Sequence, residues 1–196
     1  MFIIDLPYKR KRMKKTIYVI EDIHNLPGKK LFNLFGVEWE GTPYWWICPI
    51  WILAVGTTIA YYTQNNKGGA DFAGNGLMYA GIIALSITLH SIGHLTFGKF
   101  VGHPMTGNLV TATLPVNLYD GKRYPSRVHV IRSLGGPCIN LISGLALLAI
   151  DRLIGHNQFI QFAAYVNLMF FIVSLAPIPT MDGGVLVREL RNWRKE

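Results

Sequence analysis

The fold is decided by residues 77–100, which read LMYAGIIALSITLHSIGHLTFGKF. A helix of about 20 apolar residues crosses a hydrocarbon core of about 30 Å, and this stretch is that long. Two histidines, His90 and His94, interrupt it four positions apart. Residues i and i+4 share one face of a helix, so both imidazoles can reach one metal ion. Because polar groups inside a span need a partner, we favour metal binding over simple packing.

Three further stretches have the length of membrane-spanning helices: residues 45–62, 128–150 and 159–176. The composition agrees, since 51% of the 196 residues are hydrophobic and only 15% are charged. Aromatic residues at both ends of the first stretch match the belts at membrane surfaces. The sequence therefore predicts an all-α, polytopic membrane protein with four transmembrane helices.

The segments outside these spans carry weaker signals. Residues 102–125 are turn-rich and half apolar, which predicts an extended hairpin or a re-entrant segment. Residues 16–20 resemble a short strand, and residues 29–35 resemble a short interfacial helix with its lysines at the lipid headgroups. Cys48 and Cys138 fall in apolar segments and are expected to be buried free thiols.

The positive charges indicate an orientation. The net charge is +8, from 19 Lys and Arg against 11 Asp and Glu. Eight Lys and Arg precede the first span, five lie in the connection between the second and third spans or at the adjoining span ends, four follow the fourth, and the other two connections hold one each. The positive-inside rule then places both termini in the cytoplasm of a multi-pass protein of the inner (cytoplasmic) membrane. The basic run at residues 9–15 is interpreted as a segment that meets anionic lipid rather than nucleic acid.

A third metal ligand is expected from Asp182, in the segment APIPTMDGG at residues 176–184. Its two prolines end the fourth span, and its glycines allow a tight backbone. Asp182 then lies near the start of a helix running toward Trp193. The alternative role for Asp182 is capping of that helix.

Together these residues resemble the site-2 protease family of intramembrane zinc metalloproteases. In that family an H-E-x-x-H helix supplies two zinc ligands and a glutamate base, and a D-G motif two spans later supplies the third ligand. The resemblance covers roughly residues 76–190 and implies a three-helix core with zinc bound by His90, His94 and Asp182. Asn140, in a G-P-x-x-N element, is implied to contact substrate, with an interhelical hydrogen bond as the alternative.

The departure from the family is Ser91, which stands where the glutamate base is expected. A positioned base contributes typically 10²–10⁴-fold to a rate, and serine is a poor base at neutral pH. Asp182 is needed as a ligand, and Asp120 is the only other acid in a nearby cytoplasmic loop. We therefore expect no catalytic residue. The remaining histidines are expected at the surface or the interface: His24, His103, His129 and His156.

The sequence thus predicts a pseudoprotease that retains zinc and acts as a binding or structural subunit of a membrane complex. Its expected partners are the bilayer and a transmembrane protein. The alternatives are an active intramembrane zinc protease with an unusual base, and a pigment- or haem-binding subunit. Three parts are expected: a basic cytoplasmic segment (1–44), a first transmembrane helix (45–63), and a membrane core with a cytoplasmic C-terminal helix (76–196).

Overall fold

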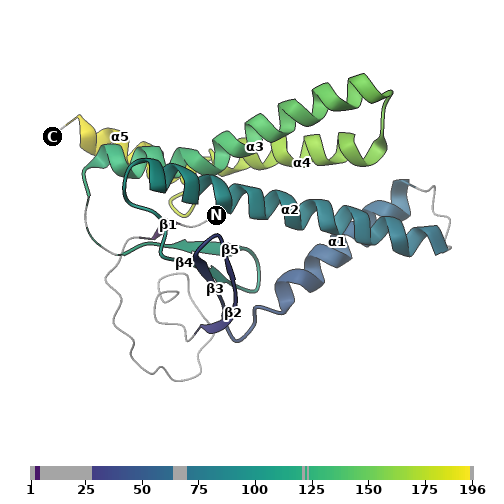
Figure 1. The fold of residues 1–196 in the computed structure, drawn as a ribbon, viewed down its shortest axis with the longest axis horizontal. Coiled ribbons are helices and arrows are strands. Elements are labelled where there is room, and N and C mark those ends of the chain that lie inside the picture. Colours follow the sequence, from purple (N-terminus) through teal and green to yellow (C-terminus); the bar gives the residue numbers. More distant parts are fainter. Residues whose placement is uncertain (1–2, 5–27, 64–69, 121, 123, 195–196) are drawn as a thin grey trace.

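The protein is described as a computed structural model, which covers residues 3–4, 28–63, 70–120, 122 and 124–194. The basic run and the first strand expected before residue 28 lie outside these residues. Figure 1 shows long helices side by side, with a small sheet against one end of the helix α2 (Ala70–Phe100).

Helices make up most of the described chain, at the expected positions. They are α1 (Ile47–Thr63), α2 (Ala70–Phe100), α3 (Ser126–Ile154), α4 (Gln158–Ser174) and α5 (Asp182–Trp193). Two of them, α2 and α3, are long and apolar enough to cross a membrane. The other two apolar helices, α1 and α4, have 17 residues each, and at 1.5 Å per residue each extends about 25 Å. For these two, a membrane crossing stays a prediction.

The all-α class needs correction, because the described residues also form a five-stranded sheet. The strands are β1 (Ile3–Ile4), β2 (Lys29–Leu34), β3 (Val37–Gly41), β4 (Gly107–Val110) and β5 (Pro115–Leu118). Their order in the sheet is β1-β5-β4-β3-β2, with antiparallel pairs β2–β3 and β4–β5 joined by the parallel pair β3–β4. The hairpin expected within residues 102–125 is confirmed as β4 and β5.

The interfacial helix expected at residues 29–35 is wrong, because this segment is mostly strand β2. Phe35 and Gly36 have φ angles of 53° and 81°, so they form a two-residue turn. Turns of this kind match the twist of antiparallel strands and fold the chain back on itself. The next strand, β3, alternates buried and exposed residues, and Val37 and Trp39 face the core.

Glycines set how closely the helices pack. A Cβ atom on Gly56 of α1 would lie 2.6 Å from the backbone of α2, and one on Gly93 of α2 would lie 2.3 Å from the carbonyl oxygen of Gly135 in α3. Small residues at such crossings let backbones approach closely, as in membrane helix bundles. The second crossing lies one residue before His94, so it sets the distance from α3 to the histidine pair.

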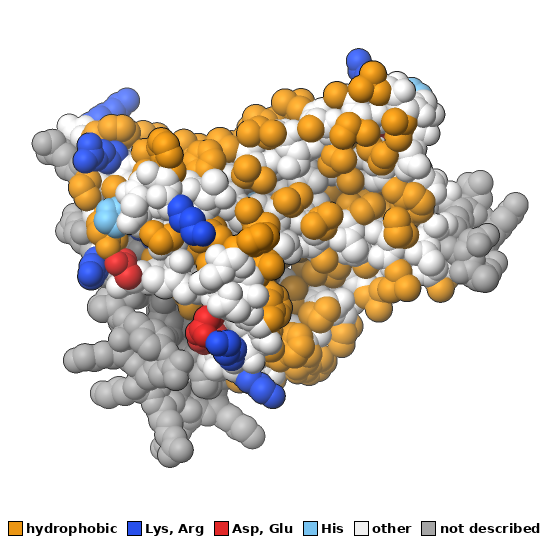
Figure 2. All heavy atoms as spheres, viewed as in Figure 1, with side chains coloured by type: hydrophobic (Ala, Val, Ile, Leu, Met, Phe, Trp, Pro, Cys, Tyr) orange, Lys and Arg blue, Asp and Glu red, His pale blue; other side chains and the backbone are white. Residues whose placement is uncertain are grey.

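Large apolar side chains remain exposed along the helices. In Figure 2 they cover the part of the molecule away from the sheet, while most Lys and Arg side chains lie at the end near the sheet and α5. An exposed apolar surface of this extent is typical of contact with lipid. Together with the two long apolar helices, it indicates a membrane protein. Examples are Leu77, Leu85, Ile142, Leu153 and Ile172.

Candidate metal centre

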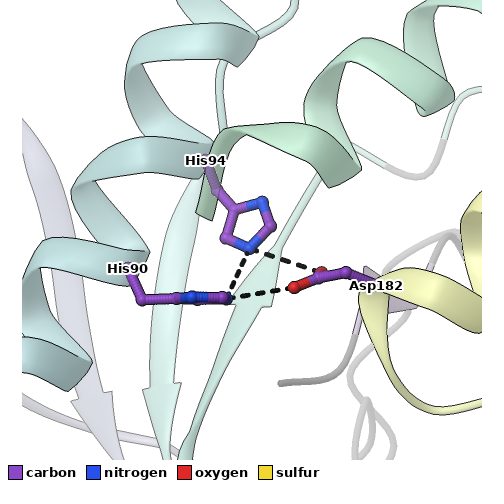
Figure 3. Close-up of side chains that lie close together, drawn as sticks. All are labelled: His90, His94 and Asp182. Atoms are coloured by element: carbon purple, nitrogen blue, oxygen red, sulfur yellow. Dashed lines mark hydrogen bonds and ion pairs between the residues drawn. The ribbon is translucent and has the colours of Figure 1, made fainter. Parts of the chain in front are cut away.

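His90, His94 and Asp182 come together at one buried point (Figure 3). The Nε2 atoms of the two histidines are 3.1 Å apart. The Asp182 carboxylate lies against both, with Oδ2 at 3.0 Å from His90 Nε2 and Oδ1 at 3.3 Å from His94 Nε2. The three residues are only 4%, 0% and 0% exposed. Side chains separated by 92 positions in the sequence thus share one site.

The path of the chain after α4 places Asp182. It is the first residue of α5, and Met181 stands at the N-cap position without a side-chain hydrogen bond to the helix, so Asp182 is not the capping residue that was considered. A Cβ atom on Gly183 would lie 2.0 Å from the carbonyl oxygen of Leu175, and one on Gly184 equally close to that of Ile178. Only glycine permits this contact between the first turn of α5 and the proline-containing loop before it.

Hydrogen bonds fix the orientation of both imidazoles. His90 Nδ1 donates to Asn140 Oδ1, and His94 Nδ1 donates to the carbonyl oxygen of Arg132 at 2.8 Å. With each Nδ1 used as a donor, each neutral ring turns the lone pair of Nε2 toward Asp182. Histidines that bind metals are held in this way, by donating their other ring nitrogen to an oxygen acceptor.

The Asp182 carboxyl is ionised in this setting. Burial alone would raise its pKa, but in the metal-free cluster the charge and Nε2–H hydrogen bonds of protonated His94 and His90 outweigh burial and hold the pKa below its ordinary value. A metal ion would take the place of these protons. Two imidazole nitrogens and one carboxylate oxygen make up a ligand set found in zinc sites.

Space for an ion exists beside this ligand set. Gly136 of α3 faces the two rings, and a Cβ atom there would lie 2.4 Å from the Nε2 atoms of both His90 and His94. Zinc–nitrogen bonds are about 2.0–2.1 Å long. The absent side chain of Gly136 therefore leaves room where both lone pairs point, and the residues fit a zinc ion.

Asn140 belongs to a buried network between three helices. Its Nδ2 donates to Asn167 Oδ1 at 2.8 Å in α4 and to the Ser86 carbonyl oxygen at 3.4 Å in α2. Asn167 Nδ2 in turn donates to Ser86 Oγ at 3.0 Å. The interhelical hydrogen bond considered for Asn140 is thus present, and contact with a substrate stays a prediction. The sequence analysis missed Asn167 and Ser86, although both are polar residues inside apolar helices, and Ser86 lies one turn before His90.

Ser91 is also buried, at 2% exposure, and is held from two sides. Its Oγ donates to the Ile87 carbonyl oxygen at 3.3 Å and accepts from Asn108 Nδ2 of β4 at 3.3 Å. Asn108 Nδ2 also donates to Asn117 Oδ1 of β5 at 3.1 Å. The sheet therefore packs amide groups, not carboxylates, against the position of the expected base.

His129 differs from its expected surface position, since it is buried in α3 at 6% exposure. It lies near the Glu189 carboxyl of α5, and its charge helps to lower the pKa of that carboxyl. The helical interface between α3 and α5 accounts for this burial. His156 is exposed, as expected, and its ring lies against Asp151 at the turn between α3 and α4.

An apolar cavity of about 70 Å³ adjoins the histidine pair. His90 forms one wall, and the other walls come from α2, the turn between β4 and β5, and the end of α4. The other lining residues are Ile87, Leu114, Pro115, Phe170, Val173, Ser174 and Met181.

Comparison with known proteins adds information on the fold. No protein-family model matches the sequence, and no curated protein matches it. Among solved structures, the site-2 protease from Methanocaldococcus jannaschii is similar, with a TM-score of 0.59 and 19% sequence identity. The match covers 84% of this chain and 71% of that one. The chain therefore has a fold like that of a site-2 protease.

Proposed function

We propose that this chain is a multi-pass membrane protein that binds zinc through His90, His94 and Asp182 but does not cleave peptide bonds. In this proposal it is a binding or structural subunit of a membrane complex, and the metal joins α2 to the start of α5. Both termini face the cytoplasm. The observation that carries the proposal is Ser91, which occupies the base position beside an otherwise complete ligand set.

The surroundings of Ser91 support the absence of proteolysis. Zinc lowers the pKa of its bound water to about 7, but a positioned base must still accept the proton and deliver it to the leaving amine. Among the side chains that the structure describes, Asp182 is the only acid in the histidine cluster. Other described acids serve elsewhere: Asp120 accepts from Tyr124, Asp151 accepts from the backbone of Asn157, and Glu189 accepts from Arg188.

The binding role is supported by the apolar cavity next to His90. A transmembrane partner would insert an apolar side chain there, and van der Waals packing against the cavity walls would favour the contact. The haem alternative is less well supported, because the two Nε2 atoms face each other and Asp182 across distances of about 3 Å. That spacing suits a small ion rather than a flat macrocycle.

The zinc content of the purified protein tests the proposed metal site. Elemental analysis of the protein purified in detergent should find about one zinc ion per chain, because the ligands are prearranged. His90→Ala, His94→Ala and Asp182→Asn should each lose it. Wild-type protein without zinc, and with stability equal to that of His90→Ala, would refute the metal site. Absorption above about 400 nm in the purified protein would instead support the haem alternative.

A cleavage assay tests the proposal that the protein does not cleave peptide bonds. The zinc-loaded native protein is compared with Ser91→Ala and Ser91→Glu on membrane-anchored peptides. We expect no cleavage by the native protein or by Ser91→Ala. Cleavage by the native protein that disappears in His94→Ala would establish an active protease and overturn the proposal.

A photo-reactive amino acid placed in the cavity tests the partner. Val173 lines the cavity, whereas Leu145 is 54% exposed on α3 and serves as the control position. Crosslinking in intact membranes should join position 173, but not position 145, to one membrane protein. Equal crosslinking at the two positions would indicate nonspecific contact in the bilayer.

A further inference from the structure

A second groove lies between α5 and the proline-containing loop that precedes it, and it shares no lining residue with the apolar cavity. Its volume is about 380 Å³. Both apolar and cationic groups line it, which distinguishes it from the cavity beside His90. The residues that matter here are Pro177, Pro179, Val187, Arg188, Arg191 and Asn192.

The charge of α5 is segregated. Its two acids, Asp182 and Glu189, are buried at 0% and 8% exposure, and the arginines of the helix are exposed. Arg188 donates through Nε to Glu189 Oε1 at 2.7 Å. This bond orients the guanidinium group and uses only one of its five N–H donors. The outward face of α5 thus presents two guanidinium groups, of which Arg188 is paired with Glu189 and keeps N–H donors for a further acceptor.

Apolar side chains lie among these arginines. Val187, Leu190 and Trp193 are 39%, 46% and 48% exposed, and Ile178 of the loop is 46% exposed. A helix that combines exposed apolar residues with arginines is suited to the boundary between headgroups and acyl chains. Arginine stems can lie along apolar surface while the guanidinium groups stay in the polar layer.

The position of α5 agrees with such a boundary. It packs on α3, and in Figure 1 it runs along the part of α3 where that helix begins. Most Lys and Arg side chains in Figure 2 lie at this end of the molecule. The last turn of α2, which ends nearby, contains Lys99. The groove is therefore at the level where the apolar surface gives way to basic side chains.

We propose that this groove binds the headgroup of an anionic phospholipid. The phosphate is held by Arg188 and Arg191, because guanidinium groups match phosphate oxygens in a bidentate geometry. The start of the acyl chains lies along Val187 and the two prolines. The proposal depends on the membrane placement of the protein but not on zinc or on the absence of proteolysis. A bound lipid would also hold α5 against the loop that positions Asp182.

Native mass spectrometry of the full chain released from nanodiscs tests this site. The discs contain phosphatidylcholine with about one fifth phosphatidylglycerol. We expect one retained phosphatidylglycerol per chain, and a drop in occupancy of about tenfold or more in Arg188→Gln/Arg191→Gln. The charge-matched control is Arg152→Gln/Arg194→Gln, which removes two arginines outside the groove and should retain the lipid. Arg191→Gln alone leaves the Arg188–Glu189 bond intact and should reduce occupancy without disturbing the fold.

Several outcomes would overturn the proposal. One is equal retention of phosphatidylglycerol by the native protein and by both groove variants. Another is equal retention of phosphatidylcholine and phosphatidylglycerol, which would show no selection for charge. Inorganic phosphate alone is added in a separate arm. If it displaces the lipid completely at low millimolar concentration, the groove is a site for free phosphate instead.

Discussion

Gly136 is the residue at which zinc binding and helix packing meet most directly. Replacing it with alanine puts a Cβ atom 2.4 Å from both histidine Nε2 atoms, in the space that the ion would need. We expect Gly136→Ala to reduce zinc from about one ion per chain to none, as measured by elemental analysis. The matched control is Gly81→Ala, a helix position with no atom within 4 Å of the added Cβ. Full zinc content in Gly136→Ala would place the ion elsewhere.

Asn140 affects the same site from the other side of the His90 ring. Leucine at this position removes the acceptor for Nδ1–H, so the ring is free to turn and Nε2 becomes a weaker ligand. Zinc affinity should fall about 10–100-fold, as measured by competition with a chelator. Asn167→Leu is the control, since it cuts the network one residue farther away and leaves the acceptor in place. If the two variants lose the same affinity, Asn140 only stabilises the helix bundle.

At the scale of elements, the crossing of α1 and α2 depends on Gly56. Alanine there would bring a Cβ atom within 2.6 Å of the Ala80 nitrogen and the Gly76 oxygen. We expect Gly56→Ala to lower the free energy of unfolding by about 1–3 kcal/mol through overpacking. Gly74→Ala, with open space around it, should be neutral or stabilising because alanine favours the helix. Thermal unfolding in detergent measures both, and an unchanged melting temperature in Gly56→Ala would contradict the close crossing.

Docking of α5 should depend on pH through Glu189. Burial would raise the pKa of this carboxyl, but the hydrogen bond from Arg188 and the charges of Arg188 and His129 outweigh it and lower the pKa. A lowered pKa means that the folded protein favours the ionised carboxylate. This contribution is fully present above the ordinary glutamate pKa of about 4.3 and is lost as the pH falls through the lowered value.

We therefore expect Glu189→Gln to lower the melting temperature by about 2–4 °C at pH 7. The difference from the native protein should shrink as the pH falls below about 4. A difference that stays constant from neutral to acidic pH would show that the carboxylate charge contributes nothing.

The sequence predicted the features that depend on residues close together in the chain. The spacing of His90 and His94 requires only a helix, and Asp182 follows from a proline break and a glycine pair that are contiguous in the sequence. Strand β2 could not be predicted, because its backbone partners come from β3 and its exposure does not alternate. The network of Ser86, Asn140 and Asn167 joins three helices, and no spacing rule identifies which polar residues will meet across such distances.

At the scale of the whole molecule, the number of membrane crossings depends on whether the 17-residue helices span the bilayer. Between Leu153, which is 85% exposed, and Arg194, only α4 can cross. Cysteines at these two positions, in a background without Cys48 and Cys138, report on that crossing. An impermeant maleimide should label Leu153→Cys from the outside of cells and Arg194→Cys only from the cytoplasmic face. Labelling of both from one side would show that α4 does not span.

The distance in sequence between His90 and Asp182, 92 positions, has a consequence for biogenesis. During synthesis the two histidines emerge together in one helix, long before the aspartate is made. A nascent chain can then offer a passing ion only two of its three ligands, and such a site releases ions readily. Stable loading of a metal would wait until α3 and α4 have formed and α5 has packed onto α3. A bound metal would thus be retained only by chains whose folding is complete.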